Sequence, residues 1–217
     1  MTIRARIFRS SKRHFDCQRL DNKEMVTATA LAMLLKEDHI VVGDWVELIP
    51  PPVVGQEWVI EKVIKRNNAI FRNLPRVQKK SVIAANVDVM LVVTSADRPD
   101  YKRGLVDRYL VRSEYWDIPA YLIFNKMDLY TGDHFDINFE AERLKWLNVE
   151  CFEVSASDGK YKQKHLDQGF VELSEKLRGK TAILIGQSGV GKSRMITELS
   201  EGRIQLLSGE TNRANKG

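Results

Sequence analysis

The pattern of apolar and polar positions changes character after about residue 80. Before that point, residues 3–7 alternate apolar and polar side chains, as a strand with one buried face does. Residues 41–48 form a similar run interrupted by a Gly-Asp pair, which indicates a turn or bulge. Residues 58–64 and 69–72 flank a polar stretch and predict a hairpin. Several short strands in so little chain predict a small barrel, a class that includes oligonucleotide-binding folds.

The rest of the chain alternates short apolar runs with apolar residues at helical spacing. This alternation predicts right-handed crossovers and a parallel sheet covered by helices on both faces. In such a sheet a ligand binds beyond the carboxyl ends of the strands. The expected strands are residues 87–93, 120–124, 150–154 and 181–185. The expected inward helical positions are Leu105, Val106, Tyr109, Leu110 and Ser113, then Phe139, Leu144 and Leu147, then Leu166, Phe170, Leu173 and Leu177.

These patterns predict two domains, an all-β barrel in residues 1–80 and an α/β domain in residues 81–217. One stretch, residues 26–35, is ambiguous. Its Ala, Leu and Met residues favour a helix, whereas its neighbours favour a strand.

The positive charge is concentrated in the predicted barrel. The net charge is +5, and residues 1–80 carry 15 Lys and Arg against 9 Asp and Glu, a net of +6. This imbalance predicts a polyanionic partner such as nucleic acid, and a solvated basic surface is the alternative. The residues that could bind phosphates are Arg4, Arg6, Arg9, Lys12, Arg13 and His14. Phe8 and Phe15 lie between them and could stack on bases, but they could equally belong to the core.

Several functional classes are not expected. No apolar run approaches the ~18 residues that a membrane span needs, and the basic N-terminus has no secretory apolar core after it. Cys17 and Cys151 are far apart and have no CxxC partner, which favours reduced thiols in a cytosolic protein. A metal site built from these cysteines and the scattered histidines is not expected.

A phosphate-binding loop is predicted directly after the last apolar strand. The segment Gly186-Gln187-Ser188-Gly189-Val190-Gly191-Lys192-Ser193, followed by Arg194, fits GxxxxGK[ST] between a strand and a helix. Glycines allow the backbone N–H groups to approach a polyphosphate, and the helix N-terminus adds partial positive charge. Lys192 would contact the outer phosphates and the Ser193 hydroxyl would ligate Mg²⁺. A plain glycine-rich turn would not explain the Lys-Ser pair.

A base-recognition loop is predicted at the end of the second α/β strand, where Asn125-Lys126-Met127-Asp128 fits NKxD. The Asp128 carboxylate can accept two parallel hydrogen bonds from guanine N1–H and the 2-amino group, which adenine cannot supply. Asn125 can tie the loop and bond the purine edge, while the Lys126 stem packs along the base. After the third strand, a backbone N–H of Ser155-Ala156 could meet guanine O6. The predicted ligand is GTP or GDP.

The order of these motifs is reversed relative to the usual GTPase arrangement, because NKMD begins 61 residues before Gly186. A circularly permuted chain can build the same sheet. The chain resembles the ribosome small-subunit-dependent GTPase A family, which is circularly permuted. The segments that carry the resemblance are residues 42–44, 72–76, 84–88, 107–110, 125–129 and the phosphate loop.

This resemblance implies an N-terminal oligonucleotide-binding (OB) barrel that contacts ribosomal RNA, then a permuted P-loop GTPase domain, then a zinc domain. Family members hydrolyse GTP slowly alone and faster on the small ribosomal subunit. The resemblance also implies that residues 26–35 form a barrel strand. We therefore expect a cytoplasmic, monomeric protein with the small subunit, its rRNA and GTP/GDP as partners, and no membrane.

The chain departs from the family after Ser193, because the 24 residues that follow contain no Asp and hence no DxxG segment. The zinc ligands are absent as well. We therefore expect an α/β domain that is incomplete at its C-terminus, in a truncated GTPase or in a nucleotide binder without turnover, and we assign no catalytic residue. Asp97 could replace an Mg²⁺ ligand, but a place in a strand-end turn beside the base pocket fits it better. Thr197 and Thr211 are weak switch candidates.

Three functional hypotheses follow. The leading one is a GTPase of ribosome assembly. The second is an RNA-binding module whose nucleotide site only stabilises the fold. The third, a small-molecule phosphotransferase, leaves NKMD without a role.

Overall fold

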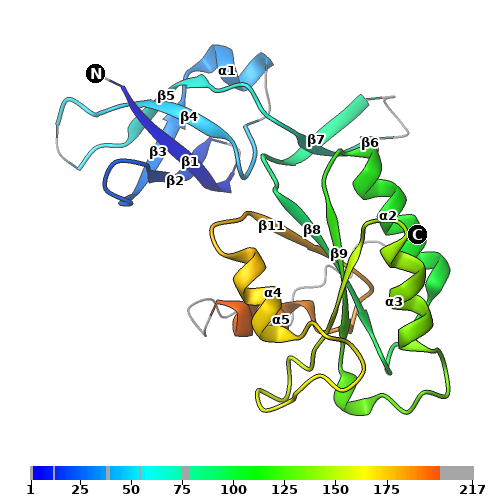
Figure 1. The fold of residues 1–217 in the computed structure, drawn as a ribbon. Helices are drawn as coiled ribbons and strands as arrows, with labels where there is room; N and C mark the ends of the chain where they lie inside the picture. The colour runs from blue at the N-terminus through cyan, green and yellow to red at the C-terminus, as the bar shows by residue number, and fades with distance from the viewer. Residues whose placement is uncertain (1, 12, 38–39, 54, 75–78, 201–217) are drawn as a thin grey trace. The chain divides into compact units, whose positions relative to one another are not determined.

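The chain divides into two compact units, Met1–Val87 and Asp88–Gly217, which are described separately. The computed structural model describes residues 2–200 except for residues 12, 38–39, 54 and 75–78 (Figure 1). The division falls seven residues after the expected boundary at residue 80. The reason is that strand β7 (Lys79–Ala85) pairs with β6 (Ala69–Leu74) in the first unit.

The first unit contains the barrel that the alternating pattern predicts. Its strands close in the order β1-β2-β3-β5-β4, with β3 and β5 parallel and the other pairs antiparallel. Every second side chain points inward, so residues such as Ile7, Phe15 and Leu48 fill the interior and are at most 2% exposed. The strands are β1 (Ile3–Ser10), β2 (His14–Arg19), β3 (Met25–Ala30), β4 (Trp45–Ile49) and β5 (Trp58–Val63).

Two expectations for this unit need correction. The predicted hairpin of residues 58–64 and 69–72 is wrong, because closure of the barrel occupies both edges of β5 and leaves β6 to pair with β7. The ambiguous stretch, residues 26–35, is only partly a strand. Strand β3 ends at Ala30, and helix α1 (Ala32–Glu37) follows it, so each propensity prevails in one half of the stretch.

Gly43 and Asp44, which interrupt the apolar run just before β4, each have a structural role in the first unit. The Asp44 side chain is fully buried and accepts hydrogen bonds from Arg66 Nε at 2.6 Å and Nη2 at 2.8 Å. Its neighbour Gly43 has φ of +90°, and a Cβ there would lie 2.0 Å from the carbonyl oxygen of Ala85. Only glycine allows β7 to approach this turn so closely.

The second unit is the predicted parallel sheet covered on both faces. The strands lie in the order β10-β9-β8-β11, and every adjacent pair is parallel. Helices α2 and α3 cover one face, while α4 and α5 cover the other (Figure 1). The strands are β8 (Val89–Ser95), β9 (Ala120–Asn125), β10 (Glu150–Glu153) and β11 (Ala182–Ile185). The helices are α2 (Arg103–Tyr115), α3 (Ile137–Lys145), α4 (Phe170–Leu177) and α5 (Lys192–Leu199), with a 3₁₀ turn η1 (Met127–Leu129).

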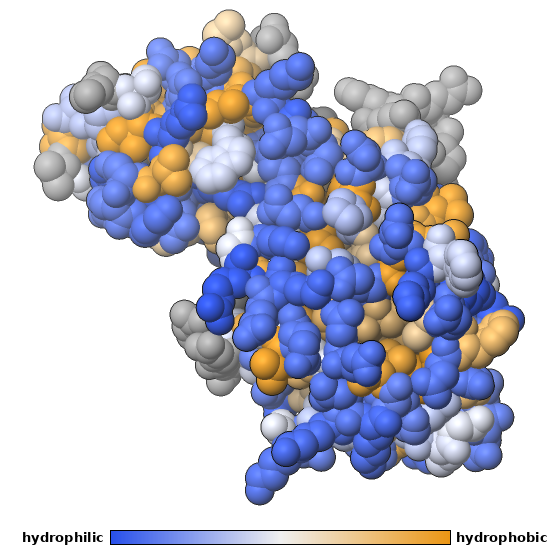
Figure 2. All heavy atoms as spheres, in the orientation of Figure 1, coloured by the Kyte–Doolittle hydropathy of each residue, from blue (hydrophilic) through white to orange (hydrophobic). Residues whose placement is uncertain are grey.

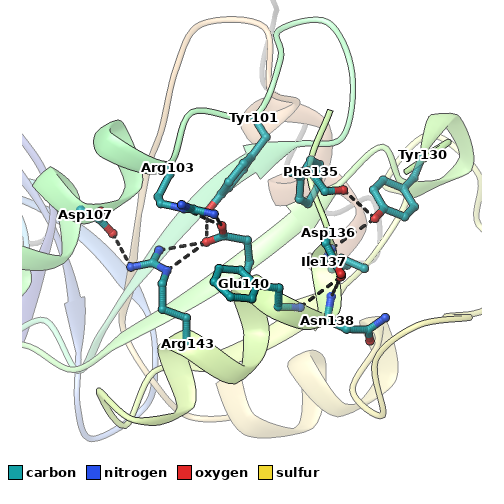
Figure 3. A network of polar contacts seen from close by, with 11 residues as sticks. Tyr101, Arg103, Asp107, Tyr130, Phe135, Asp136, Ile137, Asn138, Glu140 and Arg143 are labelled. Atoms are coloured by element: carbon teal, nitrogen blue, oxygen red, sulfur yellow. Dashed lines mark hydrogen bonds and ion pairs between the residues drawn. The ribbon is translucent and has the colours of Figure 1, made fainter. Parts of the chain in front are cut away.

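The buried face of α3 differs from the expected one. Phe139 and Leu147 are 56% and 60% exposed, whereas Glu140 is fully buried beside Leu144. The reason is a polar network in which Glu140 accepts hydrogen bonds from Tyr101 Oη at 2.8 Å, Arg103 Nε at 2.6 Å and Arg143 Nη2 at 3.0 Å (Figure 3). A buried carboxylate with this many donors is stable where a sequence pattern favours an apolar residue.

The surface of the described residues is mixed in hydropathy. Hydrophilic residues cover most of the face shown in Figure 2, and hydrophobic residues are scattered among them. Within the described ranges, none of the helices has the length and apolar character needed to cross a bilayer.

Replacing Glu140 with alanine should lower the free energy of unfolding by about 3 kcal/mol, because Arg103 and Arg143 lose a buried counter-charge. Burial alone would raise the pKa of this carboxyl, but hydrogen bonds from Arg103, Tyr101 and Arg143 hold the pKa below its ordinary value. The contribution of Glu140 is therefore complete above the unfolded-chain pKa of about 4.3 and is lost as the pH falls through the depressed pKa of the folded protein. Urea unfolding at several pH values measures both effects. Glu142→Ala, an exposed position on α3, is the control and should change stability little.

Candidate nucleotide-binding site

Three loops follow the carboxyl ends of neighbouring parallel strands. The predicted phosphate loop follows β11, the NKMD loop follows β9, and Ser155-Ala156 follows β10. Because all the strands are parallel, these loops lie along one edge of the sheet.

The phosphate loop has the backbone that its glycines predict. Helix α5 begins at Lys192, and its N-cap is Gly191 with φ of +94°. A Cβ at Gly191 would lie 2.3 Å from Asn125 Nδ2, and one at Gly186 would lie 2.2 Å from the carbonyl oxygen of Val93. These glycines therefore let the loop pack closely against β8 and the NKMD loop. The side chain of Val190 is 2% exposed and packs in the core, while Ser188 and Gly189 are exposed.

Lys192 is folded back over this loop. Its Nζ donates hydrogen bonds to the carbonyl oxygens of Gly186 at 2.8 Å and Gln187 at 2.7 Å. Burial lowers the pKa of the Lys192 ammonium below its ordinary value. Both carbonyl partners are neutral, so they leave the positive charge of Lys192 uncompensated. An anion bound in the loop would stabilise the charged ammonium.

Ser193 lies in the first turn of α5, half-buried beside Lys192. Among the described residues, its hydroxyl makes no side-chain hydrogen bond, although its backbone carbonyl accepts one from Thr197 Oγ1 at 3.2 Å. A free hydroxyl at the start of a helix, next to a cation that can hold phosphate, fits an Mg²⁺-nucleotide complex.

Asn125 joins the three loops. Its side chain is almost fully buried, and its Nδ2 donates to the carbonyl oxygen of Val190 in the phosphate loop at 2.8 Å. Its Oδ1 accepts the backbone N–H of Ala156 at 2.9 Å. This amide group therefore ties the phosphate loop to both predicted base-recognition loops. The Ala156 N–H that we expect to meet guanine O6 is bonded to Asn125 in this structure.

The Asp128 side chain is exposed, as a group that contacts a ligand must be. Its Oδ1 accepts a hydrogen bond from Ser155 Oγ at 2.5 Å. The Ser155-Ala156 loop, the second of the two predicted base-recognition loops, therefore positions the carboxylate. Lys126 has a left-handed conformation with φ of +59°, and its Nζ donates to the carbonyl oxygen of Arg98. Met127 is buried and anchors the turn by donating its N–H to Val154 O at 3.1 Å.

Arg194 links α5 to the base-recognition side. Its Nε donates to the carbonyl oxygen of Ala156 at 3.0 Å, and its Nη2 pairs with Glu198 at 3.0 Å. The sequence pattern includes Arg194 only as the residue after the phosphate loop. Its contact with Ala156 spans 38 positions in the chain, so no local pattern indicates it.

The weaker candidates lie elsewhere or are engaged. Asp97 pairs with Arg98 at 3.3 Å and lines a cavity of about 320 Å³ together with residues that follow NKMD, such as Tyr130 and His134. Thr211 lies outside the described residues. In the part of the chain that the structure describes, no group of three or more His, Cys, Asp or Glu residues could hold a metal ion.

Comparison with protein families gives one match that covers most of the chain. The sequence model of the RsgA GTPase family matches residues 63–217. Two curated relatives carry the name "Small ribosomal subunit biogenesis GTPase RsgA". The one from Porphyromonas gingivalis is 33% identical over 162 residues, which are 74% of this chain and 49% of that protein. The one from Chlorobaculum parvum is 37% identical over 180 residues, 79% of this chain and 54% of that protein. The chain thus spans about half the length of these relatives.

Solved structures show the same fold. YjeQ from Thermotoga maritima has a TM-score of 0.75 and 25% identity, with 96% of this chain and 68% of YjeQ aligned. YloQ, described as a circularly permuted GTPase, has a TM-score of 0.70 and 24% identity, with 94% of this chain and 66% of YloQ aligned. The barrel, the parallel sheet and the reversed order of the motifs agree with these structures, and the chain belongs to the RsgA GTPase family.

Proposed function

We propose that this chain binds GTP and GDP at the carboxyl edge of its parallel sheet and serves as a GTPase in biogenesis of the small ribosomal subunit. The observation that carries the proposal is the Asn125 bridge, which fixes a phosphate loop and a guanine-type recognition loop beside each other. The names of the relatives support the biological context.

In this proposal the two ends of the nucleotide have separate contacts. The phosphates lie against the backbone N–H groups at the start of α5, where Lys192 exchanges its carbonyl partners for phosphate oxygens. Ser193 ligates Mg²⁺, which neutralises phosphate charge when it is bound. Asp128 accepts two hydrogen bonds from the guanine edge, held in place by Ser155.

GTP hydrolysis is part of the proposal for the whole protein. The described residues provide phosphate binding, base recognition and one Mg²⁺ ligand, and we assign none of them to the attacking water. Hydrolysis would change the contacts at the γ-phosphate and thereby the affinity for the small subunit, as in other nucleotide-dependent switches.

The barrel is the proposed rRNA contact. Arg4, Arg9, Arg13 and His14 are exposed on or beside β1 and β2, and Phe8 is 53% exposed among them. Phe15, by contrast, is 2% exposed and belongs to the barrel core. Such a surface offers both phosphate contacts and one stacking platform. Work on ribosomal subunits would place the protein in the cytoplasm, and we propose that it acts as a monomer.

An RNA-binding module without nucleotide turnover is the second candidate, favoured by the exposed basic residues and the exposed Phe8 of the barrel. RNA binding that ignores the nucleotide state would support it. Coupling between GTP and subunit affinity would support the GTPase.

Replacing Asp128 with asparagine should weaken GDP binding by about 10²-fold or more and should strengthen binding of xanthosine diphosphate. The reason is that the NH₂ group of the introduced asparagine would face the 2-amino group of guanine, which is also a donor. Xanthine has a carbonyl oxygen at that position and can accept the hydrogen bond. Fluorescent-nucleotide titration measures both affinities. Asp133→Asn, in the exposed segment that follows, is the control. Unchanged GDP affinity in Asp128→Asn would refute the base assignment.

Replacing Lys192 with alanine should lower affinity for GTP and GDP by at least about 10²-fold, because a partly buried charge that faces the phosphates is lost. The variant should stay folded, since the lysine bonds only to carbonyl groups of its own loop. Calorimetric titration and circular dichroism report the two results. Lys145→Ala on α3 should bind as the wild type does.

Replacing Arg9 and Arg13 with alanine together should weaken binding to small subunits and reduce the slope of log K against log salt concentration by roughly one for each phosphate contact removed. Sedimentation with subunits at several salt concentrations measures the slope. Lys62→Ala, an exposed lysine on β5, serves as the matched control. If the double variant keeps the wild-type slope, this part of the barrel does not contact RNA.

A further inference from the structure

The last residue of β10, Glu153, is a buried glutamate. It has no role in the phosphate and base contacts proposed above. Glu153 is 1% exposed and stands two positions before Ser155. The Oε1 atom accepts the Tyr161 hydroxyl at 2.5 Å and the Lys164 N–H at 3.0 Å. The Oε2 atom accepts the N–H groups of His165 and Leu166, both at 2.8 Å.

These contacts close a long irregular segment onto the strand that precedes it. The segment runs from Ser155 to Gln168, and the Glu153 N–H donates to the Gln168 carbonyl at 2.9 Å. Both the backbone and the side chain of Glu153 therefore hold the far end of the segment. Such an irregular segment has no ladder of its own to fix its course.

The surroundings of Glu153 differ from those of the other buried glutamate, Glu140. Glu140 faces two arginines, whereas Glu153 has no ion pair with any described residue. Burial alone would raise the pKa of Glu153, but the Tyr161 hydroxyl and three backbone N–H groups hold it below the ordinary value. Three successive N–H groups that converge on one carboxylate form a nest that a neutral amide cannot fill, because its NH₂ group would face donors.

The near end of the same segment contains the second base-recognition loop. Ser155 donates to Asp128, Ala156 donates to Asn125, and the Ala156 carbonyl accepts from Arg194. A shift of this segment would therefore move the Asp128 carboxylate directly, whereas the phosphate loop has further contacts of its own with β8 and with Asn125 Nδ2.

We propose that Glu153 is a positioning residue for base specificity, which holds the Ser155–Asp128 pair in the geometry that distinguishes guanine from bases without a 2-amino group. This inference rests on the proposed guanine nucleotide site. It assigns to Glu153 an effect on the choice of base, not on phosphate affinity.

The test compares affinities of the full chain for GDP and inosine diphosphate, which lacks only the 2-amino group. Partial unfolding lowers both affinities by the same factor, so the ratio of the two isolates base recognition. In Glu153→Gln we expect the preference for GDP to fall at least fivefold. The control is Glu150→Gln at the other end of β10, where Glu150 pairs with Lys176 at 2.5 Å, and it should keep the wild-type ratio.

Tyr161→Phe provides a milder variant, because it removes one hydrogen bond to Glu153 and leaves the three N–H contacts. Its GDP preference should fall in the same direction by a smaller factor. A wild-type ratio in folded Glu153→Gln would overturn the inference. If Glu153→Gln does not fold, an unchanged ratio in Tyr161→Phe would overturn it. A wild-type chain that binds ADP as well as GDP would refute the proposed function itself, which is a separate outcome.

Discussion

The hydrogen bonds of one buried amide are the constraint on which the candidate site depends. Asn125 reaches Val190, 65 positions later in the chain, and Ala156, 31 positions later. An amide side chain suits this role because it donates and accepts at the same time, and a carboxylate could not bond to the Val190 carbonyl. The NKMD loop, which we propose recognises the base, is thus also the joint between the loops. A Cβ at position 191 would lie 2.3 Å from Asn125 Nδ2, so this close approach of the phosphate loop requires glycine there.

The two buried glutamates show two ways in which this unit stabilises a buried negative charge. On the α2 and α3 side, Glu140 is matched by arginines and a tyrosine that fix the start of α2 against α3. At the end of β10, Glu153 is matched by a tyrosine and by backbone N–H groups of an irregular segment. The first arrangement stabilises packing of helices, while the second gives a defined course to a segment without regular structure.

Much of this molecule could be predicted from local sequence, and the failures have physical causes. Alternation and helical spacing indicated the barrel and the parallel sheet, and the glycines indicated the phosphate loop. The hairpin of β5 and β6 was wrong because strand pairing depends on barrel closure, a property of the whole unit. The buried face of α3 was wrong because Glu140 finds partners 37 and 39 positions earlier, in Arg103 and Tyr101. Glu153 gave one local signal, a charged residue inside an apolar run just before Ser155-Ala156, but its partners lie in a loop that no periodicity describes.

The reversed order of the motifs has a consequence for the newly made chain. During translation the NKMD and Ser155-Ala156 loops leave the ribosome before the phosphate loop does, and N-terminal parts of a chain generally fold first. Strands β8, β9 and β10 can therefore pair while the carbonyl that Asn125 needs has not yet been synthesised. Binding of the proposed nucleotide would then become possible only when β11 and α5 have joined the sheet, so a bound nucleotide would report that the nascent α/β unit has completed this step.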